Sequence, residues 1–314
     1  MSLILAAVGI LSGLGVTSAC RTIHSMFIFG DSYSATGFQA DSPFPTLSQP
    51  FGYPSVGVRP GDYYADGSSL SLSTASSGPV WLQYLAMHYN TTPTLTYNFA
   101  VGGASIPGSF TEEVEQMYMP RFSALFSRSR AGVPASSGGI TWSADSSLFS
   151  IWIGINDINW CGPIFFPSPS KTMKSCLPAR FNHLTAALEK LYRTGARRFL
   201  FINVPPLDRT PFVAERGPEI AEAYRSGVEL FNGAFLPSWV SGFKTDHPDI
   251  TTLTFDFHKL MNGILDRPHE WGFTDATCVR GHGDHKCVWA DPLHPTHEVH
   301  RHLAEQLKAA GVGM

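Results

Sequence analysis

Five short apolar runs alternate with helical patterns along this 314-residue chain, and this alternation constrains its fold more than any other feature. The runs are residues 26–29, 95–100, 148–153, 199–203 and 251–255. They lack the polar alternation of a strand with one wet face, which is typical of strands buried on both faces. Strands that alternate with helices form parallel sheets covered by helices. We therefore predict a single α/β domain.

Helical patterns fill the segments between these runs. Residues 178–193 carry the clearest one, with four apolar residues at helical spacing. Helices are also predicted at residues 80–88, 111–130, 218–243 and 295–310. Pro120 is expected to kink its helix. Residues 39–79 are rich in Ser, Pro, Gly and Tyr and show no periodicity, so we expect a long loop that covers or rims a site at the carboxyl edge of the sheet.

The N-terminal segment and the composition bear on where the protein works. Residues 2–19 are apolar and end in small residues, which predicts a signal peptide over residues 1–19 and a single domain over residues 20–314. Only 15% of the residues are charged, the net charge is −3, and no basic patch favours a nucleic-acid partner. No other run reaches transmembrane length. We expect a secreted, extracellular monomer without stable membrane insertion.

The cysteines fit an oxidising compartment. They are Cys20, Cys161, Cys176, Cys278 and Cys287. The neighbouring pairs Cys161–Cys176 and Cys278–Cys287 are candidate disulfides, although spacing alone leaves other pairings open. Cys20 would remain at the cleavage site or as a free thiol. In a secreted chain, Asn90 would start a glycosylation sequon with Thr91 and Thr92.

Polar residues follow three of the predicted strands, and two more precede the last helix. Ser32 comes after the first run, Gly103 after the second and Asn156 after the third, whereas Asp291 and His294 lie three residues apart near the C-terminus. Ligands of open parallel sheets bind outside the carboxyl ends of the strands. A serine nucleophile needs a base and a residue that orients the base, which His294 and Asp291 can provide.

Ester hydrolysis also needs hydrogen-bond donors for the oxyanion. Candidate donors are the backbone N–H groups of Ser32 and Gly103 and the side-chain amide of Asn156. Each of these residues alone could be an ordinary turn or helix-cap residue, but their combination in this order favours a serine hydrolase. No Gly-x-Ser-x-Gly motif is present, which disfavours an α/β-hydrolase with a nucleophile elbow.

Four short motifs carry a family resemblance. They are Phe-Gly-Asp-Ser ending at Ser32, Asn-Phe-Ala-Val-Gly-Gly-Ala containing Gly103, Gly-Ile-Asn-Asp containing Asn156, and Asp-Pro-Leu-His ending at His294. In this order they resemble the blocks of the GDSL, or SGNH, hydrolase superfamily. The resemblance implies the flavodoxin-like SGNH fold, a three-layer α/β/α sandwich around a five-stranded parallel sheet. It assigns Ser32 as nucleophile, His294 as base, Asp291 as its orienter, and Gly103 and Asn156 to the oxyanion hole.

Further stretches narrow the resemblance. Residues 29–38, 77–81 and 271–274 are similar to those of secreted fungal acetylesterases of carbohydrate esterase family 16, although relatives often carry Asn where this chain has Ser77. This implies a secreted serine esterase that removes acetyl groups from plant cell-wall oligosaccharides through an acyl-enzyme, with a small-molecule or oligosaccharide ester as partner. The alternatives are a lipase or phospholipase of the same superfamily and a catalytically silent carbohydrate-binding protein.

Tryptophans are candidates for stacking against a sugar ring. Trp160, expected in a loop after Asn156, and Trp81 are the predicted substrate-binding residues, and Trp152 is a weaker candidate. For Trp81 and Trp152 a core position is at least as good an interpretation.

A metal site is the competing interpretation of the C-terminal region. His282 and His285 lie between Cys278 and Cys287, which resembles a zinc loop. The cysteine spacing does not fit a standard zinc finger, however, and the run from His297 to His300 is one residue too short for His-Glu-x-x-His. We predict no metal and no cofactor, and we expect His297, His300 and His302 to be surface residues of the last helix.

Overall fold

The computed structural model describes residues 22–53, 74–89, 94–123, 143–165, 172–280 and 286–312. The predicted signal peptide, Cys20, Asn90, His282 and His285 lie outside these residues, as does the middle of the 39–79 segment. No helix in the described ranges is long and apolar enough to cross a membrane.

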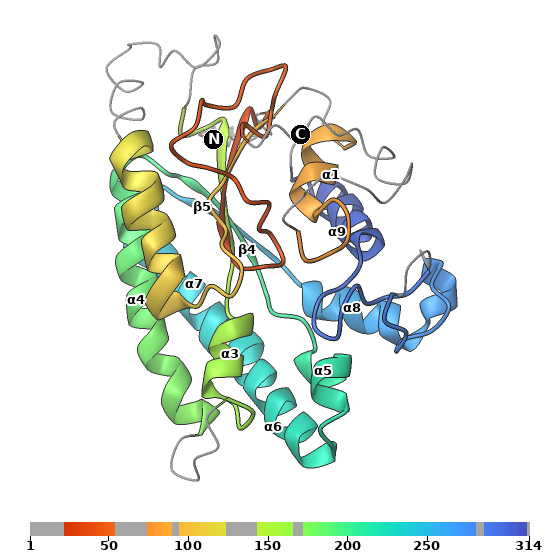
Figure 1. Cartoon of the computed structure of the whole chain (residues 1–314). Coiled ribbons are helices and arrows are strands. Elements are labelled where there is room, and N and C mark those ends of the chain that lie inside the picture. The colour runs from red at the N-terminus through yellow and green to blue at the C-terminus, as the bar shows by residue number, and fades with distance from the viewer. Residues whose placement is uncertain are drawn as a thin grey trace, which may run out of the picture.

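Five parallel strands form the centre of the fold (Figure 1). They are β1 (Ser25–Gly30), β2 (Leu95–Asn98), β3 (Ser147–Trp152), β4 (Arg198–Ile202) and β5 (Thr251–Phe255). Their order across the sheet is β2-β1-β3-β4-β5, and every neighbouring pair is parallel. This is the flavodoxin-like strand order, so the predicted sheet is confirmed.

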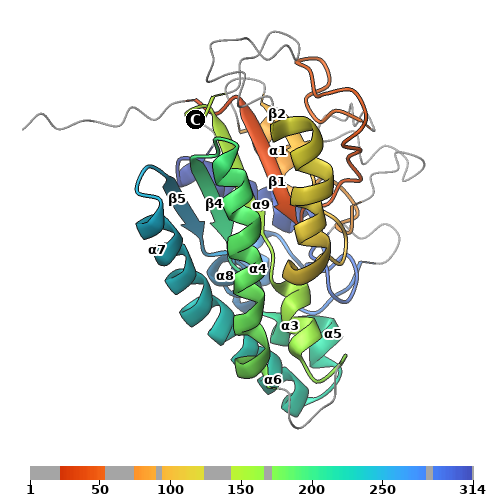
Figure 2. The same ribbon diagram turned by 90° about the vertical axis from the view of Figure 1, so that its left-hand side faces the viewer.

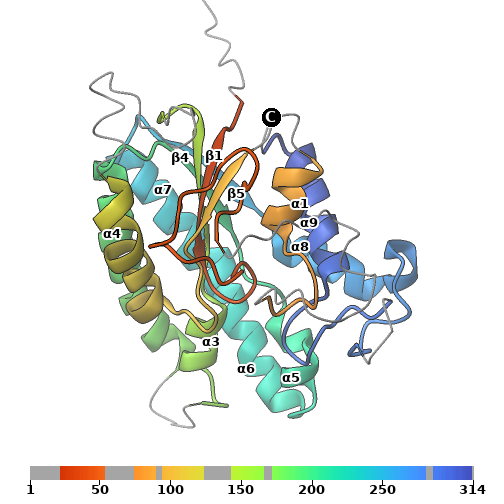
Figure 3. The same ribbon diagram turned by 45° about the horizontal axis from the view of Figure 1, so that its top comes forward.

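Helices cover both faces of the sheet. They are α1 (Trp81–Met87), α3 (Ile155–Cys161), α4 (Met173–Arg193), α5 (Pro211–Ala214), α6 (Pro218–Glu229), α7 (Leu236–Asp246), α8 (Phe257–Asp266) and α9 (His297–Ala309). Helices α4 and α7 lie on one face, and α1, α8 and α9 lie on the other (Figure 1). Figure 2 looks onto the first face, with α4 in front of the strands, and Figure 3 shows the same layers from above. The predicted three-layer sandwich is confirmed.

Aromatic rings pack the middle of the sheet. All six residues of β1 are buried, and Phe27 stacks between Tyr97 of β2 and Phe149 of β3, with centroid distances of 4.8 and 4.7 Å. The edge strand β5 is different, because its residues are exposed or half-buried, whereas those of the other edge strand, β2, are all buried. The expectation that every strand is buried on both faces is therefore wrong for β5.

Two long helices contain a π-helical turn just before a proline. The helix predicted at residues 111–130 is described to residue 123, and its π-helical turn Glu113–Tyr118 ends two residues before Pro120. In the same way, α6 runs into α7 through the π-helical turn Leu230–Phe235, two residues before Pro237. A proline ring clashes with the carbonyl four residues earlier, and a wider turn relieves this clash. The kink expected at Pro120 is therefore a widened turn.

Some boundaries and elements differ from the sequence prediction. Helix α4 begins at Met173 rather than Pro178, because the side chain of Thr172 caps it by accepting a hydrogen bond from the N–H of Ser175. The segment after β3, expected as a loop, forms the short helix α3, and helices α5 and α8 were not predicted. Short helices of this kind depend on tertiary packing more than on local propensity.

The strand order has its switch point between β1 and β3. From β1 the chain crosses to β2 on one side, and it later returns to β3 on the other side of β1. At such a switch point the loops after the two strands diverge and leave space for a ligand. Ser32 follows β1 and Asn156 follows β3, so both lie at this switch point.

Candidate active site

Ser32, the predicted nucleophile, lies in a tight turn at the carboxyl end of β1. Gly30 starts the turn with φ of +150°, and a Cβ there would be 2.1 Å from the carbonyl oxygen of Trp152, so only glycine fits. The carbonyl of Asp31 then accepts hydrogen bonds from the N–H groups of Ser34 and Ala35, both at 2.9 Å. The turn is therefore fixed directly against β3.

Ser32, His294 and Asp291 form a continuous hydrogen-bonded chain. The Oγ of Ser32 lies 2.8 Å from Nε2 of His294. Nδ1 of the same ring lies 2.7 Å from Oδ2 and 2.9 Å from Oδ1 of Asp291. These distances meet the requirement that nucleophile, base and orienter lie within hydrogen-bonding reach. The structure thus joins residues that are 262 positions apart in the sequence.

The segment that carries Asp291 and His294 is held by its own backbone. The N–H of Ala290 donates to the carbonyl of His294 at 2.8 Å, which closes the loop. Upstream, the indole of buried Trp289 donates to the carbonyl of Ala276 at 2.8 Å. The predicted disulfide between Cys278 and Cys287 is present and ties together the two stretches that lead into this loop.

Tyr33 connects the serine turn to the histidine loop. Tyr33 follows Gly-Asp-Ser in the sequence, at the position of the leucine in the Gly-Asp-Ser-Leu motif. Its hydroxyl donates to the carbonyl of Leu293 at 2.7 Å. Its ring is buried and lies 5.6 Å from the ring of His294. Burial raises the pKa of Tyr33 well above its usual value, so the hydroxyl keeps the proton that it donates.

Asp291 is held in its ionised form. Half-burial alone would raise its pKa, but the hydrogen bond and charge of His294 and the N–H groups of Leu293 and His294 outweigh burial and lower it. Both N–H groups donate to Oδ1, at 2.8 and 2.9 Å. A fixed carboxylate selects the imidazole tautomer with a proton on Nδ1, which leaves Nε2 free to accept one.

The three predicted oxyanion donors lie beside this switch point, on the turns that carry Ser32 and Gly103 and on helix α3, which carries Asn156. Among the described residues, the backbone N–H groups of Ser32 and Gly103 donate to no protein acceptor. Gly103 has φ of +78°, and a Cβ there would meet no atom within 4 Å, so the space beside it is open. The amide of Asn156 donates to the carbonyl of Ala104 at 2.9 Å, which places it against the glycine loop and leaves its second hydrogen available.

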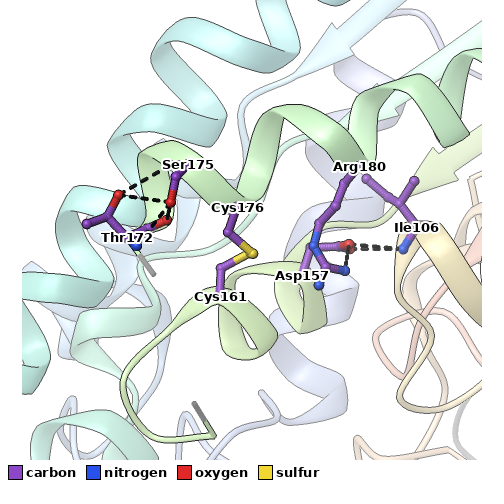
Figure 4. Close-up of a disulfide and its surroundings, with 7 residues drawn as sticks. All are labelled: Ile106, Asp157, Cys161, Thr172, Ser175, Cys176 and Arg180. Atoms are coloured by element: carbon purple, nitrogen blue, oxygen red, sulfur yellow. Dashed lines mark hydrogen bonds and ion pairs between the residues drawn. A yellow bond between two sulfur atoms is a disulfide. The ribbon is translucent and has the colours of Figure 1, made fainter. Parts of the chain in front are cut away.

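A buried ion pair fixes helix α3, which carries Asn156. The carboxylate of Asp157 accepts from the N–H of Ile106 at 3.1 Å and from Arg180 of α4 at 2.7 Å (Figure 4). Burial raises the pKa of Asp157, and the charge of Arg180 opposes this effect. One turn farther along α3, the predicted disulfide between Cys161 and Cys176 joins the helix to α4 (Figure 4).

Glu113 is a buried residue of the site that the sequence interpretation missed. Its carboxyl oxygens accept from the N–H of Gly30 at 2.8 Å and from the N–H of Val101 at 3.2 Å. It therefore links the strand end that leads to Ser32 with the loop that leads to Gly103. Glu113 lies three residues after buried Phe110 on a helix, so an acidic residue on an apolar face was the available signal.

Asp31 is a second buried carboxyl group beside the nucleophile. It has no exposed surface, and burial raises its pKa from 3.8 to about 7. Its Oδ1 accepts from the N–H of Tyr33 at 3.0 Å, whereas its Oδ2 has no partner in the described part of the chain. An unpartnered buried oxygen favours the protonated form, because the charged form is poorly solvated there.

The predicted substrate-contacting tryptophans have different surroundings. Trp81 is fully buried and donates to the hydroxyl of Ser34 at 3.0 Å, and Trp152 is also fully buried. Their rings belong to the core and cannot stack against a sugar, so the prediction for Trp81 is wrong. Trp160 is 43% exposed, but it lies on helix α3 and not in a loop.

The histidines of the last helix are not surface residues as expected. His297 and His300 have 1% exposure, and His302 is largely buried. Burial lowers the pKa of His300 to about 3, so its ring is neutral. His300 lies at helical spacing from the buried residues Leu303 and Leu307, which explains its inward position. Among the described residues, no group of three or more His, Cys, Asp or Glu side chains could hold a metal ion.

The fold and the site together define a class of protein. A flavodoxin-like parallel sheet carries a Ser-His-Asp chain at its switch point, and amide donors lie on the adjacent turns and on helix α3. This is the arrangement of an acyl-transferring hydrolase that activates a serine.

Comparison with known proteins gives the family. Residues 26–307 match the GDSL-like lipase/acylhydrolase family. An acetylesterase from Thermothelomyces thermophilus is 33% identical over 293 residues, covering 92% of this chain and 88% of that one. A GDSL esterase/lipase from Zea mays is 26% identical over 301 residues, covering 87% and 74% of the two chains. The chain belongs to the GDSL-like lipase/acylhydrolase family and is a carboxylic-ester hydrolase.

One solved structure is also similar. It is a variant of an acetyl-xylooligosaccharide esterase from Geobacillus, with 12% sequence identity and a TM-score of 0.49, and the match covers 92% of this chain and 94% of that one. The family assignment does not depend on this distant likeness.

Proposed function

We propose that this protein is a secreted serine esterase that removes acetyl groups from acetylated carbohydrates, with Ser32, His294 and Asp291 as its catalytic residues. The hydrogen-bonded chain between these side chains is the observation that carries the proposal. Its geometry matches the first step of acyl transfer, because His294 Nε2 already lies 2.8 Å from the hydroxyl that must lose its proton.

The reaction proceeds in two halves. Ser32 Oγ attacks the acetyl carbonyl carbon while His294 accepts the hydroxyl proton, and Asp291 stabilises the imidazolium that forms. The tetrahedral intermediate collapses when His294 gives this proton to the departing sugar oxygen, which leaves an acetylated Ser32. A water molecule then attacks the acyl-enzyme while His294 accepts its proton, and His294 returns this proton to the departing Ser32 Oγ, which releases acetate and free Ser32.

The oxyanion of each tetrahedral intermediate needs donors that are already in place. The N–H groups of Ser32 and Gly103 and the remaining amide hydrogen of Asn156 are the proposed donors. The hydrogen bonds of Asp157 and Glu113 support this role because they fix the loops that carry these donors before substrate arrives. Such preorganised donors need no rearrangement when charge develops.

The likeness to a fungal acetylesterase supports the acetylated substrate. The sequence also lacks a long apolar insertion of the kind that serves as a lid in lipases. Exposed Trp160 is the proposed contact to the sugar, since a flat aromatic face suits the apolar face of a pyranose.

Secretion is part of the same proposal. We infer cleavage of residues 1–19, a single hydrolase domain over residues 20–314, glycosylation at Asn90 and a monomer in solution. Two disulfides within one small domain support an oxidising compartment.

A rate series on p-nitrophenyl esters tests the acyl preference. We expect acetate to butyrate esters to be hydrolysed far faster than palmitate. A preference for acyl chains of twelve or more carbons would reject the acetylesterase function in favour of a lipase. The series is run beside release of acetate from acetylated xylan fragments, because p-nitrophenol is a much better leaving group than a sugar hydroxyl.

A further inference from the structure

Three aromatic side chains form a row on the surface near the site. Trp160 at the end of α3 lies 6.0 Å from Phe165, and Phe165 stacks 6.3 Å from Phe212 of α5, as measured between ring centroids. Trp160 and Phe165 are 43% and 49% exposed. Single exposed apolar residues are common, whereas adjoining exposed rings form a candidate binding surface.

One end of this row adjoins the proposed oxyanion hole. Asn156 and Trp160 are four residues apart on α3, so they share one face of the helix about 6 Å apart along its axis. Residues at this spacing are neighbours on the helix surface. Trp160 is therefore next to the place where the acyl carbonyl would be held.

The other end of the row adjoins the histidine loop. The N–H of Phe212 donates to the carbonyl of Pro292, which lies between Asp291 and His294, at 2.8 Å. The guanidinium of Arg216 lies 4.0 Å from the centroid of the Phe212 ring and covers one of its faces. The row thus runs along one side of the site, from the oxyanion donors to the catalytic base.

We propose that Trp160 and Phe165, supported by Phe212, form a platform that binds a sugar ring of the substrate on the alcohol side of the scissile ester. This inference rests on the acetylesterase function proposed above and extends it to the part of the oligosaccharide beyond the acetylated unit. The platform would make the enzyme prefer acetylated oligosaccharides over acetyl esters of small alcohols.

The shape and position of the platform favour a sugar over an acyl chain. A pyranose presents a flat face of C–H groups, which matches exposed ring faces, while its hydroxyl groups remain in water. An acyl chain gains most when it is enclosed on several sides, and half-exposed rings do not enclose it. His294 must also protonate the leaving alcohol, so the ring row that ends at its loop lies on the alcohol side.

The test compares two substrates in variants of the full-length protein. The kcat/KM on acetylated xylotriose is divided by the kcat/KM on p-nitrophenyl acetate. We expect Trp160→Ala and Phe165→Ala each to lower this ratio roughly 3- to 10-fold, the range expected for one aromatic contact, and Trp160→Phe to restore most of it. Met87→Ala is the matched control, because Met87 is an apolar residue of similar exposure (42%) at the end of α1, which carries none of the proposed site residues. It should keep the wild-type ratio.

The remaining outcomes separate failure of the platform from failure of the acetylesterase function. An unchanged ratio in both alanine variants excludes a sugar contact. A selective loss on p-nitrophenyl octanoate instead shows that the rings hold an acyl chain. Binding of unacetylated xylotriose to Ser32→Ala, measured by calorimetry, is independent of turnover. If wild type fails to deacetylate acetylated xylotriose but Ser32→Ala binds unacetylated xylotriose and this binding is lost when Trp160→Ala is added, the acetylesterase function fails while the platform stands. If deacetylation occurs without such binding, the platform alone fails.

Discussion

The buried carboxyl group of Asp31 should make the stability of this protein depend on pH. Its pKa is 3.8 in an ordinary environment and about 7 in the folded protein, where burial disfavours the charged form. Between these values the folded state holds a proton that the unfolded state releases. The free energy of unfolding therefore falls as the pH rises through this window. A pKa change of one corresponds to about 1.36 kcal/mol, so the loss attributable to Asp31 between pH 4 and pH 8 is about 4 kcal/mol.

The variant Asp31→Asn isolates this contribution. Asparagine resembles the protonated carboxyl group in size, and its oxygen can still accept the N–H of Tyr33. Urea unfolding followed by tryptophan fluorescence at pH 4 to 8 gives the free energy of unfolding of both proteins, and other carboxyl groups cancel in the difference. The variant should gain about 4 kcal/mol relative to wild type as the pH rises to 8. A difference that stays constant with pH would refute a protonated Asp31 in the folded state.

Three further predictions concern the groups around the triad. Asn156→Ala should lower kcat by about 10²–10³, the cost of one oxyanion donor, and should lower the free energy of unfolding by only about 1 kcal/mol, because its hydrogen bond to the carbonyl of Ala104 is lost; an unchanged kcat would remove Asn156 from the oxyanion hole. Glu113→Gln keeps only one of the two side-chain oxygens that accept from the N–H groups of Gly30 and Val101. The free energy of unfolding should therefore fall by about 1–3 kcal/mol, and kcat should fall as well. A fully active variant of wild-type stability would contradict the link between the two loops. Replacing both Cys278 and Cys287 with serine should cost about 2–3 kcal/mol, measured by urea unfolding without reductant; free thiols at both positions in the wild-type protein would contradict this disulfide.

The sequence was sufficient for the sheet and for bringing Ser32, His294 and Asp291 together, because both follow from short local motifs and the strand order. Each strand is a short apolar run, and the residues that follow β1 and β3 must meet at the switch point in any sheet of this order. The Asp-Pro-Leu-His stretch confines orienter and base to one turn. The four motifs therefore locate Ser32 and His294 without knowledge of side-chain contacts.

Residues that act through long-range contacts could not be predicted in this way. Glu113 forms its hydrogen bonds to residues 83 and 12 positions away, and the hydroxyl of Tyr33 bonds to a carbonyl 260 positions away. Composition likewise cannot tell an exposed tryptophan from a buried one. The sequence favours Trp160 over Trp81 only through an expected loop position, and it is burial that decides between them.

Loss of activity in Ser32→Ala tests the central claim most directly. The variant is compared with wild type and with Ser241→Ala, which changes an exposed serine of α7, after circular dichroism and urea unfolding have shown that all three are folded. With p-nitrophenyl acetate, Ser32→Ala should lose activity on the million-fold scale seen when a catalytic serine is removed, and Ser241→Ala should match wild type. If folded Ser32→Ala keeps more than about a hundredth of wild-type activity, against that scale, Ser32 is not the nucleophile and the proposed mechanism is wrong.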